Sequence, residues 1–263
     1  MKNKKLYRII GIVIIIILSL LFIVGLFWTP YSPTKMNAAL KNSAPSMSHI
    51  FGCDNYGRDI FSRVMSGLGN TFLIAICTVI IGSVIGTFIG LFTGYYGGVA
   101  DEIIMRFNDI ILSFPSVLLA LVIISILGKG KFKIIIALGI LFIPSFARMA
   151  RGETIKVKKM GYIESAKALG ISNRRIIYKH ILPNIFPKVM TNVAVGFNNA
   201  VIAESSMSYL GLGVLPPAQS LGRMISEAQS FLFVCPWYAI YPGITIIIMI
   251  IGFSLLSSGL SEQ

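Results

Sequence analysis

The most informative residue spacing in this chain lies in a basic stretch, residues 151–188, between two apolar runs. Small side chains follow Glu164, and apolar side chains recur further along the stretch. A helix with a small-residue face can approach a neighbouring protein closely, and the basic residues around it can pair with acidic groups of that partner. The stretch therefore predicts a short helix that fits a groove on another protein.

Side chains that could perform catalytic or metal chemistry are sparse. Cys53, Cys77 and Cys235 show neither a metal-ligand spacing nor a disulfide framework. The two histidines, His49 and His180, lie far apart in sequence. The sequence contains no GxxxxGK[ST] phosphate-binding loop, so the chain cannot hold a nucleotide in that manner. We predict a protein that is not an enzyme and that needs no metal or cofactor.

The composition is that of a membrane protein. Of 263 residues, 55% are hydrophobic and 13% are charged, against about 25% charged in a typical soluble domain. The net charge of +13 could suggest nucleic-acid binding, but the basic residues flank apolar runs instead of covering a soluble surface. This placement favours the positive-inside bias of membrane proteins, without nucleic-acid binding.

Apolar runs of roughly 20 residues predict transmembrane helices. The first run is longer than the apolar region of a signal peptide and ends in Phe27 and Trp28, which favours a retained anchor. We divide the chain into an N-terminal anchor helix (1–28), an extracytoplasmic segment (29–68) and a core (69–263). The predicted all-α fold has six spans, at about residues 9–28, 71–92, 103–127, 134–150, 189–212 and 239–256.

Two local patterns refine these spans. Gly82, Gly86, Gly90 and Gly94 recur every four residues, a stripe that lets two helices pack closely in lipid. Pro115 interrupts the third span and predicts either a kink or a junction of two helical pieces.

The distribution of basic residues orients the spans. With six spans both termini lie on one side, and that side carries 15 Lys and Arg residues against eight on the other. The positive-inside rule then places both termini, and the basic stretch 151–188, in the cytoplasm.

The spacing of the basic stretch resembles a known motif. Glu164-Ser165-Ala166, followed by Gly170 and by Leu182-Pro183, is similar to the EAA motif of importer-type ABC permeases, with serine where the pattern prefers alanine. Further blocks resemble the dipeptide, oligopeptide and nickel branch, in its C-type subunit, and these blocks lie at residues 52–63, 106–115 and 203–217.

The resemblance implies a permease subunit of an ATP-driven importer in the bacterial plasma membrane. It implies a second permease subunit, two cytoplasmic ABC ATPase subunits and an extracytoplasmic substrate-binding protein as partners. Its substrates would be di- or oligopeptides, or nickel in free or chelated form. Between the fourth and fifth spans it implies a coupling helix, whose ATPase-coupling residues are Tyr162, Glu164, Ser165, Ala166, Leu169, Gly170, Arg174, Leu182 and Pro183.

Two further groups have open roles. Asn192, Asn198, Asn199 and Glu204 make the fifth span polar, and they either line a translocation path or hold helices together. Before the second span, a turn rich in charge either docks the binding protein or satisfies its own polar groups, and its residues are Asp54, Asn55, Arg58 and Asp59.

One further expectation concerns an ion pair, and one alternative concerns the class of transporter. Arg106 and Asp109, near the start of the third span, are expected to form an ion pair. An ion-gradient-driven secondary transporter or channel is the alternative class of protein. It would predict paired inverted repeats and buried acidic residues for coupling ions, and the sequence shows no convincing repeat.

Overall fold

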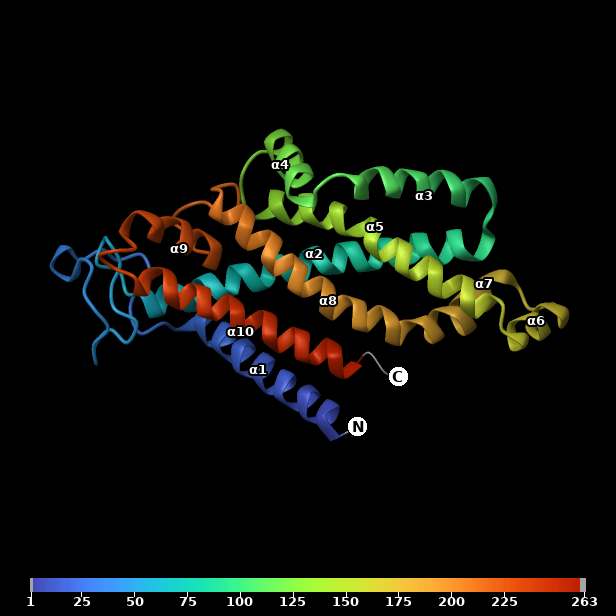
Figure 1. Ribbon diagram of the computed structural model, residues 1–263, viewed down its shortest axis with the longest axis horizontal. Coiled ribbons are helices and arrows are strands. Elements are labelled where there is room, and N and C mark those ends of the chain that lie inside the picture. The colour runs from blue at the N-terminus through green and yellow to red at the C-terminus, as the bar shows by residue number, and fades with distance from the viewer. Residues whose placement is uncertain (1, 261–263) are drawn as a thin grey trace.

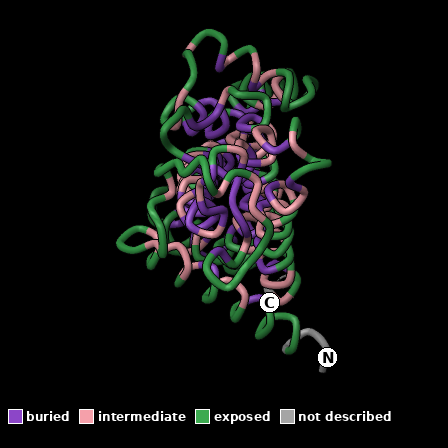
Figure 2. The backbone as a smooth tube through the Cα atoms, turned by 90° about the vertical axis from the view of Figure 1, so that its left-hand side faces the viewer, coloured by how far each residue is buried: buried purple, intermediate pink, exposed green. Residues whose placement is uncertain are grey.

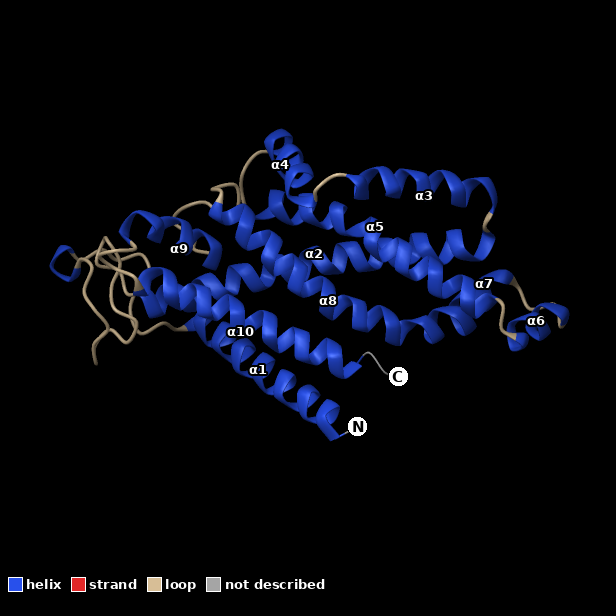
Figure 3. Ribbon diagram, viewed as in Figure 1, coloured by secondary structure: helices blue, strands red, loops and turns tan. Residues whose placement is uncertain are grey.

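A computed structural model describes residues 2–260 of the chain. In this range the regular structure is helical throughout (Figure 3), apart from one isolated antiparallel bridge between Cys53 and Asp59. The helices form an elongated bundle with loops concentrated at one end (Figure 1). Buried residues gather along its centre, and exposed residues cover the outside (Figure 2).

Five long helices form the bundle, and shorter helices flank them. The long ones are α1 (Lys2–Phe27), α2 (Ile60–Tyr96), α5 (Lys131–Lys158), α8 (Leu182–Tyr209) and α10 (Trp237–Leu260). The shorter ones are α3 (Gly98–Ser113), α4 (Ser116–Leu127), α6 (Gly161–Ala168), α7 (Asn173–Ile176) and α9 (Leu221–Ala228). Single turns occur at η1 (Ala38–Leu40), η2 (Ile177–Ile181, of π type) and η3 (Gln229–Phe231).

Length and composition identify the helices that can cross a membrane. Within residues 2–260, four single helices qualify, and the pair α3 and α4 makes a fifth if it counts as one span. The helix α8 lies outside this group because asparagine and serine interrupt its apolar character. Its 28 residues nevertheless exceed the roughly 20 that a membrane crossing requires.

The helix α2 begins at Ile60, well before residue 71, where the apolar run suggested its start. The side chain of Asp59 caps it by accepting a hydrogen bond from the Ser62 N–H at 2.7 Å. Residues 60–68, assigned from the sequence to the extracytoplasmic segment, are therefore the first turns of α2. Hydropathy alone did not reveal this start of α2, because its first turns are partly polar.

The third predicted span is two helices. Phe114 is extended, Pro115 caps α4, and the axes of α3 and α4 differ by 96°. Proline disfavours the helical conformation of the residue before it, which explains the break at this position. Of the two alternatives for Pro115, the junction is the correct one.

The glycine stripe brings α2 against α5. Gly82, Gly86, Gly90 and Gly94 all face α5, and a Cβ at Gly90 would lie 2.3 Å from the Ala147 carbonyl oxygen. No side chain fits at that distance, so the two backbones are in contact along about three turns. We infer that α2 and α5 move as one unit.

Two cysteines meet at the loop-rich end of the bundle. The Cys235 thiol donates to the Cys53 carbonyl at 3.4 Å, and both residues are buried. Burial is the main cause that raises the pKa of each thiol to about 11. Both thiols are free in the structure.

Cysteine labelling should reveal on which side of the membrane each end of the molecule lies. Met47 is fully exposed before α2, and Leu169 is 81% exposed beyond α5. We expect Met47→Cys to react with a membrane-impermeant maleimide in intact cells, and Leu169→Cys only after permeabilisation. The raised pKa keeps Cys53 and Cys235 largely in the unreactive thiol form near pH 7. Labelling of Leu169→Cys in intact cells would contradict cytoplasmic termini.

Candidate coupling surface and translocation path

The helix α6 projects from the end of the bundle opposite the loop-rich end (Figure 1). Its inner face is apolar, because Ile163 and Ala166 are buried, and Ile163 packs in a cluster with Leu91, Val157 and Ile176. These residues come from α2, α5 and α7. The helix is thus seated on the ends of the long helices and is not a free loop.

The outer face of α6 is exposed to solvent. Tyr162 is 43% exposed and Leu169 is 81% exposed, and Glu164, Ser165 and Gly170 are exposed as well. Ala166, expected among the coupling residues, points inward and serves the attachment of the helix instead. The surface offered to a partner is therefore one side of the motif only.

Gly170 ends α6 as a C-terminal cap. Its φ of +76° is in the left-handed region that favours glycine. The Ile171 N–H donates to the Ala166 carbonyl at 3.1 Å, and the Gly170 N–H donates to the Lys167 carbonyl at 2.9 Å. This is the Schellman arrangement of a helix C-terminus, and it turns the chain back toward the bundle.

The second part of the motif starts α8. Leu182 and Pro183 form its first turn, where the missing N–H of proline costs no hydrogen bond within α8. The Asn184 side chain donates to the Tyr162 hydroxyl at 2.8 Å, which joins the start of α8 to α6. Arg174 is exposed on α7 nearby. The structure thus brings both parts of the motif together at one end of the molecule.

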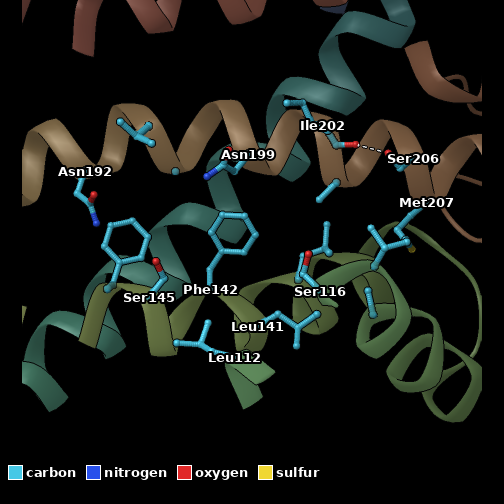
Figure 4. A pocket seen from close by; sticks show the side chains of 17 residues that line it. Leu112, Ser116, Leu141, Phe142, Ser145, Asn192, Asn199, Ile202, Ser206 and Met207 are labelled. Atoms are coloured by element: carbon cyan, nitrogen blue, oxygen red, sulfur yellow. Dashed lines mark hydrogen bonds between the residues drawn. The ribbon is translucent and has the colours of Figure 1, made fainter. Parts of the chain in front are cut away.

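A cavity of about 340 Å³ lies between α4, α5 and α8. Polar side chains reach it from all three helices, with apolar residues such as Phe142 and Met207 between them (Figure 4). None of its 17 lining residues is ionisable. The polar lining residues are Ser116 on α4, Ser145 on α5, and Asn192, Asn199 and Ser206 on α8.

The polar residues of α8 fall into two groups. Asn192 and Asn199 line the cavity, whereas Asn198 faces α10. In the amide orientation that satisfies both groups, Asn198 donates to the Ile250 carbonyl at 3.2 Å and accepts from the Ser254 N–H at 3.3 Å. Both interactions are helix packing.

Glu204 is fully buried and lies outside the lining of the cavity. The Ser208 hydroxyl donates to one of its carboxyl oxygens at 2.6 Å. Its second carboxyl oxygen has no partner among the described residues. Glu204 thus lies among packed helices and does not line this cavity.

A buried polar network organises the opposite, loop-rich end. Arg63 on α2 has no exposed surface, and it donates to Asp54, to Gln219 at 3.1 Å and to Glu227 at 2.8 Å. It also donates to Tyr238. One guanidinium thereby joins α2 to the segment before it, to α9 and to α10. Arg63 lies in the block 52–63 that resembles importer-type permeases, but the sequence did not indicate its distant partners.

The charged turn before α2 belongs to the same end. Asp54 is buried and accepts from the backbone N–H groups of Tyr56 (2.8 Å) and Arg58 (3.0 Å), as well as from Arg58 Nε at 2.6 Å. Asp59 is also buried, and it lies 2.9 Å from His49 Nδ1. These two carboxylates hold the segment together. Asn55 is only half-buried.

The expected ion pair between Arg106 and Asp109 is wrong. Arg106 pairs with Glu102, one turn earlier on α3, and Asp109 pairs with Arg148 on α5. An i to i+4 pair is as favourable on a helix as an i to i+3 pair, and sequence spacing alone could not reveal the distant partner. No group of three or more metal-binding side chains occurs in the part of the chain that the structure describes.

These features define a class of protein: a helical membrane protein with an uncharged internal cavity and a helix seated at one end. Residues 86–262 match the family of binding-protein-dependent transport system inner membrane components. The chain belongs to this family, and it is a multi-pass protein of the bacterial plasma membrane. Family membership favours an ABC importer permease over an ion-gradient-driven carrier or channel.

Individual relatives agree with this assignment. The chain is 38% identical to the glutathione transport system permease protein GsiD of Pectobacterium atrosepticum, over 92% of this chain and 82% of that protein. It is 36% identical to the dipeptide transport system permease protein DppC of Alkalihalophilus pseudofirmus, over 100% and 86% of the two chains. An inward-facing structure of the MetNI methionine ABC transporter contains a chain of the same fold, with a TM-score of 0.59, 20% identity and coverage of 75% and 96%.

The buried network should make stability depend on pH through Glu227. Burial tends to raise the pKa of its carboxyl, but the charge of Arg63 and hydrogen bonds from Arg63, Arg223 and Tyr238 outweigh burial and lower the pKa to about 2. Because this value is below the ordinary 4.5, the contribution is complete above about pH 4.5 and is lost as pH falls toward 2. Its upper limit is about 3 kcal/mol.

Glu227→Gln should therefore flatten the acid side of the stability profile. Thermal unfolding of the purified protein in detergent at pH 7, 5 and 3 measures this effect. The control is Glu102→Gln, because the Glu102 side chain is 62% exposed in its pair with Arg106. Parallel profiles for Glu227→Gln and the native protein would contradict the role of this carboxylate.

Proposed function

We propose that this chain forms half of the translocation pathway of a peptide importer and transmits the work of ATPase subunits to that pathway. The observation that carries the proposal is the pairing of two features in one chain: the uncharged cavity and the coupling motif on the exposed face of α6. In this proposal α8 is the fifth of six spans, α3 and α4 form a broken span, and both termini lie in the cytoplasm.

Energy comes from partner subunits, because the sequence has no phosphate-binding loop. The exposed side of α6, with Tyr162, Ser165 and Leu169, sits in a cleft of one ATPase subunit. When the two ATPase subunits close on ATP, this cleft moves α6 toward the axis of the complex. A second permease subunit supplies the other half of the path. The helices then alternate between inward-open and outward-open arrangements by rigid-body movement.

Peptides fit the chemistry of the cavity. Amide and hydroxyl groups such as those of Asn199 and Ser145 can exchange hydrogen bonds with a peptide backbone. An uncharged lining neither attracts nor repels particular side-chain charges, so it suits a path that passes many sequences. The lining contains no histidine, cysteine or carboxylate that could ligate free nickel. Relatives named for glutathione and dipeptide transport support the same substrate class.

The loop-rich end is where a substrate-binding protein would dock. Asp54 and Asp59 are buried, so contact falls to exposed positions around them. A small pocket of about 160 Å³ at this end is lined by Thr34, Met36 and Arg58 together with Arg223 and the 216–219 loop. Glu227 also lines this pocket and pairs with both arginines, so the pocket presents groups of both charges to that protein.

A Gly170→Arg substitution tests the coupling role. A non-glycine residue at this φ costs about 1–2 kcal/mol, and the arginine places bulk on the docking side of α6. We expect the reconstituted importer to lose peptide uptake while the variant still inserts into the membrane. The control is Gly130→Arg, because Gly130 also has a positive φ and open space around it but lies at the other end of α5. Normal uptake by Gly170→Arg would contradict docking through α6.

A bulky side chain in the cavity tests the path. We expect Asn199→Trp to reduce uptake at least about tenfold, equal to about 1.4 kcal/mol of added barrier, while ATP hydrolysis by the complex continues. The control is Ile247→Trp, because Ile247 lies on α10, away from the cavity, and is 55% exposed. Uptake and hydrolysis are measured on the same proteoliposomes. Equal uptake by the two variants would place the path elsewhere.

A further inference from the structure

Tyr95, in the last turn of α2, lies beneath the coupling segment. Its side chain is buried, with 4% of the residue exposed. It belongs to the same apolar cluster as Ile163 of α6 and Val157 of α5. A phenol at this position can also make polar contacts, and Tyr95 makes them on both sides of α6.

After α6, the Tyr95 hydroxyl donates to the Asn173 side-chain oxygen at 2.7 Å, at the first residue of α7. Before α6, the Lys158 ammonium at the end of α5 donates to the Tyr95 backbone carbonyl. One residue of α2 is thus bonded to the chain on either side of the coupling helix.

The coupling helix also contacts the Tyr95 ring. The Lys167 ammonium of α6 lies 5.3 Å from the ring centroid, and the Lys158 ammonium lies 5.5 Å from it. Both distances are within the roughly 6 Å range of a cation–π interaction. Tyr95 is therefore in contact with the end of α5, with α6 and with α7.

A movement of Tyr95 would also move the helices α2 and α5. Immediately before it in the chain, Gly94 packs so closely that a Cβ there would lie 2.8 Å from the Arg151 carbonyl oxygen of α5. A displacement of α6 that reaches Tyr95 therefore reaches both α2 and α5, and Ser145 on α5 lines the cavity.

We propose that Tyr95 is the positioning residue through which displacement of α6 reaches the α2–α5 pair and opens or closes the cavity. The proposal rests on the coupling role of α6 proposed above. It assigns Tyr95 no contact with substrate or nucleotide. Its hydroxyl keeps the coupling segment and the spans in register during the ATP cycle.

Tyr95→Phe tests the proposal, because it keeps the ring and removes only the hydrogen bond to Asn173. The protein is the complete importer, purified from membranes with its partner subunits and reconstituted in proteoliposomes. The probes are radiolabelled alanylalanine and radiolabelled glutathione. We expect peptide imported per ATP hydrolysed to fall about fivefold, the effect of one net hydrogen bond.

Matched variants separate coupling from stability. Tyr96→Phe is the control, because Tyr96 is adjacent and 57% exposed, and it should keep the native ratio. Asn173→Ala should lower the ratio as Tyr95→Phe does, and the double variant should be no worse than either single variant. A native ratio in Tyr95→Phe, or additive effects in the double variant, would overturn the proposal. A parallel fall of uptake and hydrolysis would also overturn it, because lost stability alone produces that result.

A second measurement needs no transported substrate. A bimane fluorophore on Ser145→Cys reports on the cavity, and ATP with vanadate drives the ATPase cycle. We expect the change in emission to be large in the native background and reduced about fivefold by Tyr95→Phe. An equal change in both would overturn the role of Tyr95. Failure of the native complex to import either peptide would instead count against the proposed substrate class.

Discussion

The contact between α2 and α5 is the constraint on which the rest of this structure depends. In lipid, helices gain little from burying apolar side chains, so their association relies on close packing and hydrogen bonds. Four glycines at four-residue spacing provide that packing here, with Gly90 against the Ala147 carbonyl. The resulting pair spans the molecule from the loop-rich end to α6. The helices α1, α3, α4, α6, α8, α9 and α10 each contact one or both members of this pair.

Different kinds of interaction hold the two ends of the α2–α5 pair to the rest of the chain. At the loop-rich end a fully buried guanidinium, Arg63, is shared by Asp54 and Glu227 with further donors and acceptors around it. Removing one partner of such a pair typically costs about 3–5 kcal/mol, because a buried charge is left unpaired. At the opposite end, α6 rests on apolar contacts of Ile163 and on the polar contacts of Tyr95. The loop-rich end is thus held by buried ion pairs, whereas apolar packing and the contacts of Tyr95 attach α6.

Local chemistry made part of this arrangement predictable. A glycine stripe, a glycine that ends a helix and a proline inside a span each act on their own backbone, so Gly170 and Pro115 carried their structural meaning in the sequence. The network around Arg63 was not predictable, because its partner Glu227 lies 164 residues away. The burial of Ala166 was also not predictable, because the motif specifies small residues but not the side of the helix on which each one lies.

The polar stripe of α8 shows the same limit and its functional consequence. Asn198 and Asn199 are neighbours in sequence, yet about 100° of helical rotation separates them. One side chain therefore packs on α10, and the other enters the cavity. A cavity lined this way needs only a few amide and hydroxyl groups on one face of a helix, while the other face keeps the bundle together. That division explains how one helix can be too polar to qualify as an apolar span and still lie at the centre of a membrane transporter.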